Sequence, residues 1–272
     1  MLSLSPLTIL DASPVEQVTA AAQAGFDAVG LRVAPAANER VWPMLGDTPM
    51  LRETLARLAN TGRMVLDVEL IMLRPDHRLA DVLPVLDAAV RLGARFVNVL
   101  GYDAERARLV EHFGALCAAA GERGLRLGLE FMKYSEVKTL AAAFEIVDAV
   151  GHPAATVLVD ALHLQRSGGT PADVRGFPAE RMPYLQLCDG PLEPVWPDDD
   201  TARAESRGDR LLPGDGAFPL AELVAALPAG GVVSVETPVA ALAGRPAAER
   251  ARLAYAAADR LLRSTRPLPT SN

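Results

Sequence analysis

Eight apolar runs of strand length recur along the 272-residue chain, and most are separated by a stretch with helical periodicity. The predicted strands are Leu7–Leu10, Ala28–Val33, Val65–Leu73, Phe96–Gly101, Arg126–Met132, Thr156–Leu162, Tyr184–Cys188 and Val232–Glu236. The predicted helices are Val15–Ala24, Leu51–Ala59, Val82–Leu92, Ala104–Arg123, Val137–Val150, Leu220–Leu227 and Ala247–Leu262. A strand about every 30 residues is typical of repeated β–α units, which place parallel strands side by side.

Eight such units predict an α/β protein with a closed (β/α)8 TIM barrel in a single domain. We assign residues 1–266 to the barrel and 267–272 to a flexible tail. An open, doubly wound sheet is the alternative, but no GxGxxG motif follows the first predicted strand. The charged, proline-rich stretch 191–216 breaks the repeat, and loops of that length are usually functional or disordered.

The charge of the chain excludes several classes of partner. A net charge of −7 and a pI near 5.2 argue against binding to nucleic acid or to an anionic membrane. No run approaches the roughly 20 apolar residues of a membrane-spanning helix. The cysteines, Cys117 and Cys188, form neither a disulfide framework nor a CxxC pair. We therefore expect a cytoplasmic protein with a small-molecule partner.

Polar side chains occur near the ends of four successive predicted strands, where the active sites of barrels are built. They are Glu130, Asp160, Gln186 and Glu236. Side chains alternate between the faces of a strand, and the neighbours of these residues are large aliphatics suited to packing beneath helices. All four polar side chains are therefore expected to point into the barrel.

Three carboxylates and an amide that converge at one point repel one another unless a counter-ion joins them. A divalent metal ion satisfies this requirement, and oxygen donors favour Mn²⁺ or Mg²⁺ over Co²⁺ or Zn²⁺. The alternative is that one or two of these side chains cap helices or pair with arginines.

Several stretches resemble the xylose-isomerase-like TIM barrels, a superfamily that includes sugar phosphate isomerases and epimerases, 3-dehydroshikimate dehydratases and endonuclease IV. The stretches are LEFMKYSE, LVDALHLQRSGG, LQLCDGP, RLLPGDG and SVETP. The resemblance implies that Glu130, Asp160, Gln186 and Glu236 are the metal ligands. The family often has histidine where this chain has Gln186, although an amide oxygen can also bind a metal ion.

The resemblance also implies residues that bind substrate. His163 matches the histidine of a D-x-x-H motif, and Glu136 matches a second glutamate by spacing alone. Arg207 is the first candidate for an arginine beyond the seventh strand, and Arg210 is the second. Glu136 has a structural alternative as an acid in the first turn of the following helix.

Four further residues are candidates for the predicted substrate pocket or its rim. Lys133 could bind an anionic group, although a place on the rim is favoured, and Glu69 lies near the end of the third predicted strand. Asn98 and Arg32 lie near the ends of the fourth and second strands and are expected to line the same pocket.

These residues predict a metal-dependent isomerase or epimerase of a ketose or keto-polyol. Glu130 and Glu236 would move the proton next to the carbonyl, through an enediolate that the metal stabilises. The nearest alternative is a dehydratase of the 3-dehydroshikimate or keto-inositol type. A phosphodiesterase would need a histidine-rich metal cluster, and this chain has four histidines in all. The remaining functional class is a barrel that binds a metabolite without catalysis. The resemblance also implies a homodimer or homotetramer.

Overall fold

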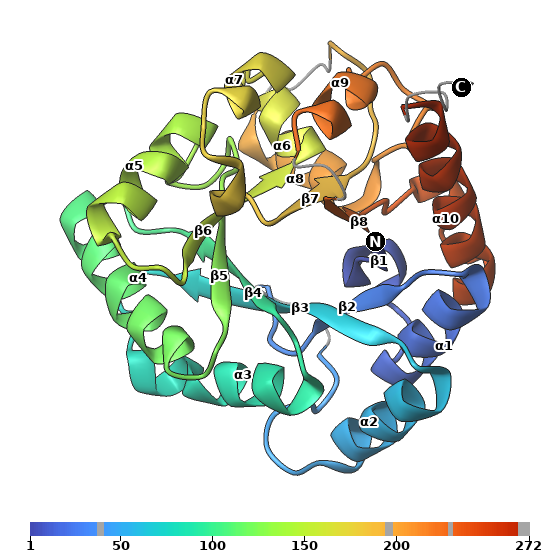
Figure 1. Cartoon of the computed structure of the whole chain (residues 1–272), viewed down its shortest axis with the longest axis horizontal. Coiled ribbons are helices and arrows are strands. Elements are labelled where there is room, and N and C mark those ends of the chain that lie inside the picture. Colours follow the sequence, from blue (N-terminus) through green and yellow to red (C-terminus); the bar gives the residue numbers. More distant parts are fainter. Residues whose placement is uncertain (37–40, 194–197, 228–230, 266–272) are drawn as a thin grey trace, which may run out of the picture.

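Eight parallel strands close into a barrel in chain order, which confirms the predicted (β/α)8 fold. The computed structural model describes residues 1–36, 41–193, 198–227 and 231–265, so the predicted tail at 267–272 lies outside the described residues. The strands are β1 (Leu2–Leu4), β2 (Ala28–Arg32), β3 (Met64–Leu73), β4 (Phe96–Gly101), β5 (Arg126–Glu130), β6 (Ala155–Asp160), β7 (Tyr184–Leu187) and β8 (Val232–Val235). In Figure 1 they occupy the centre of the molecule.

An outer ring of helices covers the strands (Figure 1). The long helices are α1 (Pro14–Ala24), α2 (Pro49–Thr61), α3 (Leu79–Leu92), α4 (Arg106–Gly121), α5 (Leu140–Val150) and α10 (Ala247–Ser264). Shorter helices are α6 (Ala161–Arg166), α7 (Pro171–Arg175), α8 (Asp199–Gly208) and α9 (Leu220–Ala225). Within the described ranges, none of the helices combines the length and the apolar character needed to span a membrane.

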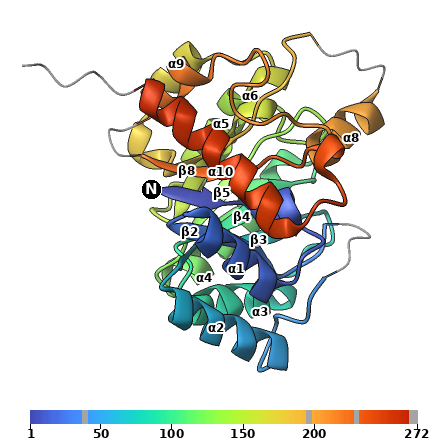
Figure 2. The same ribbon diagram turned by 90° about the vertical axis from the view of Figure 1, so that its right-hand side faces the viewer.

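The first and last helices pack against each other where the barrel closes (Figure 2). β1 pairs with β2 on one side and with β8 on the other. Ser13 caps α1 through a reciprocal pair of hydrogen bonds with Glu16, and Pro14 fills the first helical position. The chain ends of the barrel are thus joined by both strand pairing and helix packing.

The first predicted strand was wrong. Leu7–Leu10 is not a strand, because Pro6–Ile9 forms a 3-10 helix and β1 lies earlier, at Leu2–Leu4. Pro6 has no backbone N–H to donate to a neighbouring strand, and its fixed φ angle favours a turn. Ser3 pairs with Ala28 of β2 and with Ser234 of β8. The three residues Leu2–Leu4 therefore set the register of the first strand in the barrel.

Several other segments differ from the prediction, and three of the differences have clear local reasons. The strand predicted over Thr156–Leu162 ends at Asp160, because the Asp160 side chain caps α6. The helix predicted from Val137 begins at Leu140, after its cap Thr139. The loop predicted over 191–216 contains the helix α8.

The two faces of the strands belong to different apolar clusters, as the alternation of side chains predicts. Outward-facing aliphatic residues join the main core beneath the helices; among them are Leu129, Val159, Leu185, Leu187 and Val235. A small separate cluster fills the interior of the barrel with Ala28, Leu66, Phe96, Leu158 and Tyr184. The polar residues at the strand ends lie farther along the strands than this cluster.

Candidate active site

A polar pocket lies at the end of the barrel where the strands terminate. Its charged and amide side chains come from β2, β3, β4 and β5, from α6 and α8, and from the segments after α8 and β8. They are Arg32, Glu69, Asn98, Glu130, His163, Arg207, Arg210 and Glu236, and Tyr102 and Tyr134 add aromatic walls.

Asp160 is the last residue of β6, and both oxygens of its fully buried carboxylate are occupied. Oδ1 accepts the backbone N–H of His163 at 3.0 Å, and Oδ2 lies 2.6 Å from Nη1 of Arg210. Burial opposes ionisation of this group, but the positive charge of Arg210 lowers its pKa below the usual range. Asp160 therefore both caps α6 and forms an ion pair with the buried guanidinium of Arg210.

Arg210 bridges two of the predicted metal ligands. Its side chain is 1% exposed, and Nη2 lies 2.9 Å from Oε2 of Glu236. Nε donates to the backbone oxygen of Ser206 in α8 at 2.8 Å, which fixes the guanidinium from behind. Burial opposes the charge, yet the carboxylates of Asp160 and Glu236 hold the pKa of Arg210 well above its usual value.

Glu236 follows β8 and is hydrogen-bonded at both oxygens. Besides Arg210 at Oε2, the hydroxyl of Ser5 donates to Oε1 at 2.7 Å and Nε2 of Gln186 donates to it at 3.0 Å. Burial raises the pKa of Glu236, and the charges of Glu69 and other carboxylates add to the increase against the effect of Arg210.

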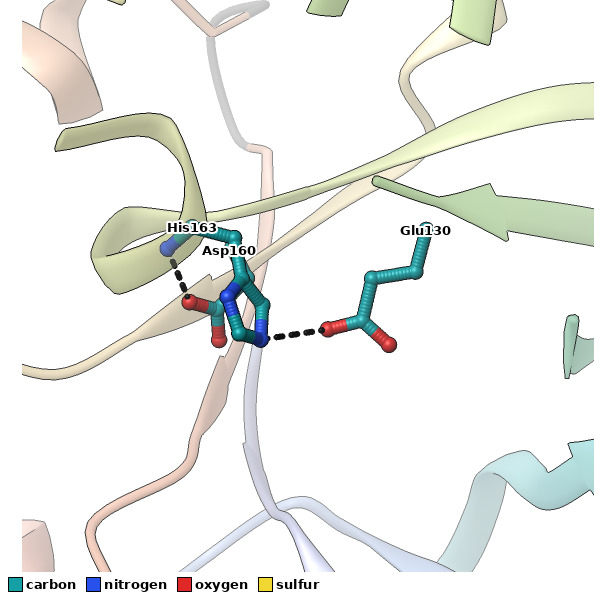
Figure 3. Close-up of side chains that lie close together, drawn as sticks. All are labelled: Glu130, Asp160 and His163. Atoms are coloured by element: carbon teal, nitrogen blue, oxygen red, sulfur yellow. Dashed lines mark hydrogen bonds and ion pairs between the residues drawn. The ribbon is translucent and has the colours of Figure 1, made fainter. Parts of the chain in front are cut away.

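Glu130 ends β5 and has fewer partners than Glu236. Nδ2 of Asn98 donates to its Oε2 at 2.8 Å, while Oε1 lies 3.5 Å from Nε2 of His163 (Figure 3). Burial and the nearby charge of Asp160 raise the pKa of Glu130 to about 8. Burial lowers the pKa of His163 to about 4. At neutral pH this pair is therefore uncharged when no cation is present.

A metal ion fits one corner of this pocket. Donor atoms of Glu130, Asp160 and His163 lie within 4.8 Å of one another, and this is the one group of three or more His, Cys, Asp or Glu with that spacing in the described part of the chain. The carboxyl groups of Glu130, Asp160 and Glu236 are all buried around this corner, and a bound cation would favour their ionised forms. Oε1 of Gln186 is also buried, with no hydrogen-bond partner among the described residues.

This donor set differs from the predicted one in composition. His163, predicted to bind substrate, lies beside Glu130 and Asp160. Gln186 lies next to Asp160 in the strand register, and its amide nitrogen is directed at Glu236. Because the carboxylate requires a donor, the amide is oriented with its oxygen free.

The predicted substrate residues divide between the pocket and the surface. Glu69 lines the pocket, where Nη2 of Arg32 lies 2.7 Å from its Oε2. Arg207 is exposed at the pocket mouth, whereas Arg210, ranked second from sequence, contacts the carboxylates. Lys133 is exposed and does not line the pocket.

Glu136 is also exposed and away from the pocket. Its predicted alternative, in the first turn of the next helix, was wrong because α5 begins only at Leu140. The hydroxyl of Ser135 donates to the Met132 and Val137 carbonyls, and this turn delays the helix.

Two pocket residues were missed from sequence. Ser5 reaches Glu236 only because β1 ends just before it, so the misplaced first strand hid this contact. Tyr134 donates its hydroxyl to Ser206 of α8 at 2.7 Å, and its ring lies edge-on to His163 at 5.8 Å. The sequence did offer a signal for Tyr134, because it lies in LEFMKYSE, four residues after the ligand candidate Glu130 near the end of a predicted strand.

Part of the chain is similar to a curated dehydratase. A 3-dehydroshikimate dehydratase from Pseudomonas putida is 30% identical to the chain over 124 residues, which are 45% of this chain. The matched part is 19% of that protein, so the chain corresponds to a minor part of its length.

Solved structures share the whole fold at low sequence identity. The IolI protein with a bound zinc atom superposes with a TM-score of 0.78 at 18% identity, over 98% of this chain and 99% of that one. D-allulose 3-epimerase from Methylomonas sp. in complex with D-allulose gives 0.69 at 16% identity, over 95% and 96%.

The sequence profile of the xylose isomerase-like TIM barrel family matches residues 18–263, which include all the strands except β1. The closed barrel and the carboxylates at its strand ends agree with this match. The chain therefore belongs to the xylose isomerase-like TIM barrel family.

Proposed function

We propose that the chain is a metal-dependent enzyme that removes the proton next to the carbonyl of a small polyhydroxylated ketone. The observation that carries this proposal is the environment of Glu130. Its carboxylate is buried and held by Asn98, and among the described residues its Oε1 has no donor closer than His163 at 3.5 Å. A buried carboxylate with one oxygen available in a polar pocket has the features of a general base.

Glu130, Asp160 and His163 would hold the cation, with Gln186 and Glu236 of the predicted set beside them. Because His163 adds an imidazole, we propose Mn²⁺ or Zn²⁺ ahead of Mg²⁺. When bound, a divalent metal polarises a carbonyl oxygen and so acidifies the neighbouring C–H bond. Asn98 orients the Glu130 carboxylate, and Oε1 of Glu130 receives the proton.

The fate of that proton separates two reactions. Epimerisation or isomerisation returns a proton to carbon, and inversion needs a second base on the opposite face. Dehydration passes the proton from Glu130 to a departing β-hydroxyl, so that water leaves and one base suffices. Glu236 is hydrogen-bonded by Ser5, Gln186 and Arg210, which makes it a poorer second base than Glu130.

Of the two reactions, we therefore favour dehydration for this chain. The curated 3-dehydroshikimate dehydratase is 30% identical to the chain over 124 residues. The D-allulose 3-epimerase is 16% identical, over 95% of the chain. Epimerisation or isomerisation of a ketose is the second candidate, and it is favoured by the shared fold of that epimerase along its length.

The test is a panel of substrates in D₂O with the purified, metal-loaded protein. NMR of ketoses, keto-inositols and 3-dehydroshikimate would follow both loss of water and uptake of deuterium at the carbon next to the carbonyl. Dehydration is supported by an unsaturated product whose formation stops on chelation of the metal. Deuterium uptake without loss of water supports epimerisation, and no change in any substrate contradicts the proposal.

A further inference from the structure

Two histidine rings meet outside the candidate active site. His77 lies in the turn between β3 and α3, and His112 lies on α4. Their ring centroids are 5.2 Å apart and their planes are inclined by 50°. Neither side chain lines the polar pocket, so the pair is separate from the Glu130 site.

Each ring has a buried nitrogen that lacks a partner. Nε2 of His77 and Nδ1 of His112 have no hydrogen-bond partner among the described residues. Burying a polar atom without a partner is costly, so such atoms usually indicate a missing ligand or water. His152 provides the contrast, because its Nδ1 accepts the backbone N–H of Ala154 at 3.1 Å.

The separation of the rings suits a shared metal ion. Tetrahedral coordination with a metal–nitrogen distance of about 2.0–2.1 Å places two imidazole centroids roughly 5.2 Å apart. A water molecule that bridges the same nitrogens at about 2.9 Å with the same angle would place them more than about 6 Å apart. The observed 5.2 Å fits a shared metal ion and is too short for a bridging water. Packed rings such as Phe26 and Tyr255 have the same separation, so the unpartnered nitrogens carry the distinction between a metal site and simple ring packing.

The charges around the pair also favour a cation. Asp76 and Asp81 act on His77 from its own turn and from α3, and Asp103 acts on His112. Asp103 is already held by Arg108 at 2.6 Å, so it contributes charge rather than a free oxygen. Burial and the proximity of His112 lower the pKa of His77, which keeps its ring nitrogen available at neutral pH.

We propose that His77 and His112 bind a second divalent ion of the Zn²⁺, Ni²⁺ or Cu²⁺ class, whose members prefer imidazole ligands. This ion would join the turn before α3 to α4, and water would complete its coordination. The inference does not depend on the reaction at Glu130, because the two sites share no residue.

The experiment measures bound Zn²⁺ per chain in the 272-residue protein by equilibrium dialysis and elemental analysis. His77→Asn and His112→Asn should each bind one equivalent fewer than the wild type, whereas the control His152→Asn should bind the same amount. In an Asp160→Asn background the equivalent that depends on His77 should remain. Loss of that equivalent in Asp160→Asn alone would assign it to the active site and overturn the proposal.

A second measurement does not require the histidine variants to fold. Cu²⁺ added to the Asp160→Asn protein should give an EPR spectrum with hyperfine splitting from two imidazole nitrogens. A spectrum without nitrogen splitting, or unchanged Zn²⁺ binding in both folded histidine variants, contradicts the second site. Failure of the substrate panel with this Zn²⁺ result intact would count against the proposed reaction alone.

Discussion

The guanidinium of Arg210 lies 2.6 Å from Oδ2 of Asp160 and 2.9 Å from Oε2 of Glu236. One positive charge from the long segment after β7 thus joins carboxylates of β6 and of the residue after β8. The same carboxylates are those expected to face a metal ion. Arg210 therefore provides the positive charge that the buried carboxyl groups of Asp160 and Glu236 share.

We predict that Arg210→Leu greatly destabilises the metal-free protein. It leaves Asp160 and Glu236 buried without their cation, and breaking a buried ion pair typically costs about 3–5 kcal/mol. Urea unfolding at pH 7 with a chelator measures the loss. Arg207→Leu is the matched control, because Arg207 lies only three residues earlier, is exposed, and forms no ion pair with the site carboxylates among the described residues. Equal midpoints for the two variants would contradict the prediction.

Asn98→Leu should lower kcat by about 10²-fold, with little change in bound metal, because Glu130 loses the donor that orients it. Steady-state kinetics with metal analysis checks this expectation. Tyr134→Phe serves as the control, since it removes a hydroxyl bonded to Ser206 but no contact to Glu130. An effect on KM alone would show that Asn98 binds substrate without positioning the base.

Glutamine substitutions at the two glutamates should have unequal effects. Glu130→Gln removes the proposed base and should slow deuterium exchange by at least about 10²-fold. Glu236→Gln should retain measurable exchange, because its carboxylate is hydrogen-bonded by Ser5 and Arg210. Complete loss of exchange in both variants would instead support two bases, and hence epimerisation.

As pH rises, the Asp67→Asn variant should lose less unfolding free energy than the wild type does. Burial and the charge of Glu69 raise the pKa of Asp67 to about 8, whereas an unfolded aspartate titrates near 3.9. Between these values the native state keeps a proton that the unfolded state has lost, so the free energy of unfolding falls as pH increases. This one group contributes at most about 1.4 kcal/mol per pH unit.

Unfolding free energies between pH 5 and 8 test this expectation, with the exposed Asp215→Asn as the control. Asparagine can still accept the hydroxyl of Tyr184, which lies 3.0 Å from Oδ2 of Asp67. The free energy of unfolding of the wild type minus that of Asp67→Asn should become more negative as pH rises. A difference that stays constant would show that Asp67 is ionised in the native protein.

Much of the fold could be predicted because two periodicities recur along the chain. β4 was predicted with its observed bounds, since Phe96–Gly101 is an apolar run between a glycine-terminated helix and a polar loop. β1 could not be predicted in the same way, because its three residues depend on pairing with β2 and β8. Long-range pairing of this kind leaves little local pattern in a sequence.

The site shows the same division. Alternation along the strands placed Glu130, Asp160, Gln186 and Glu236 on the inner face, where all four are buried. The role of Arg210 depends on how the segment with α8 folds over the barrel, and no local pattern distinguishes it from the exposed Arg207. Alternation predicts the face of a side chain but not its partner.

The 2.7 Å hydrogen bond between Ser5 and Glu236 links positions separated by 231 residues. During synthesis on the ribosome, the first of these residues emerges long before the second. A growing chain that lacks the eighth strand therefore has the pocket residues of the first seven strands, but neither Glu236 nor the strand that pairs with β1. Pairing of β1 with β8 is thus the last step that closes the wall around the pocket, and the Ser5–Glu236 hydrogen bond can form only then.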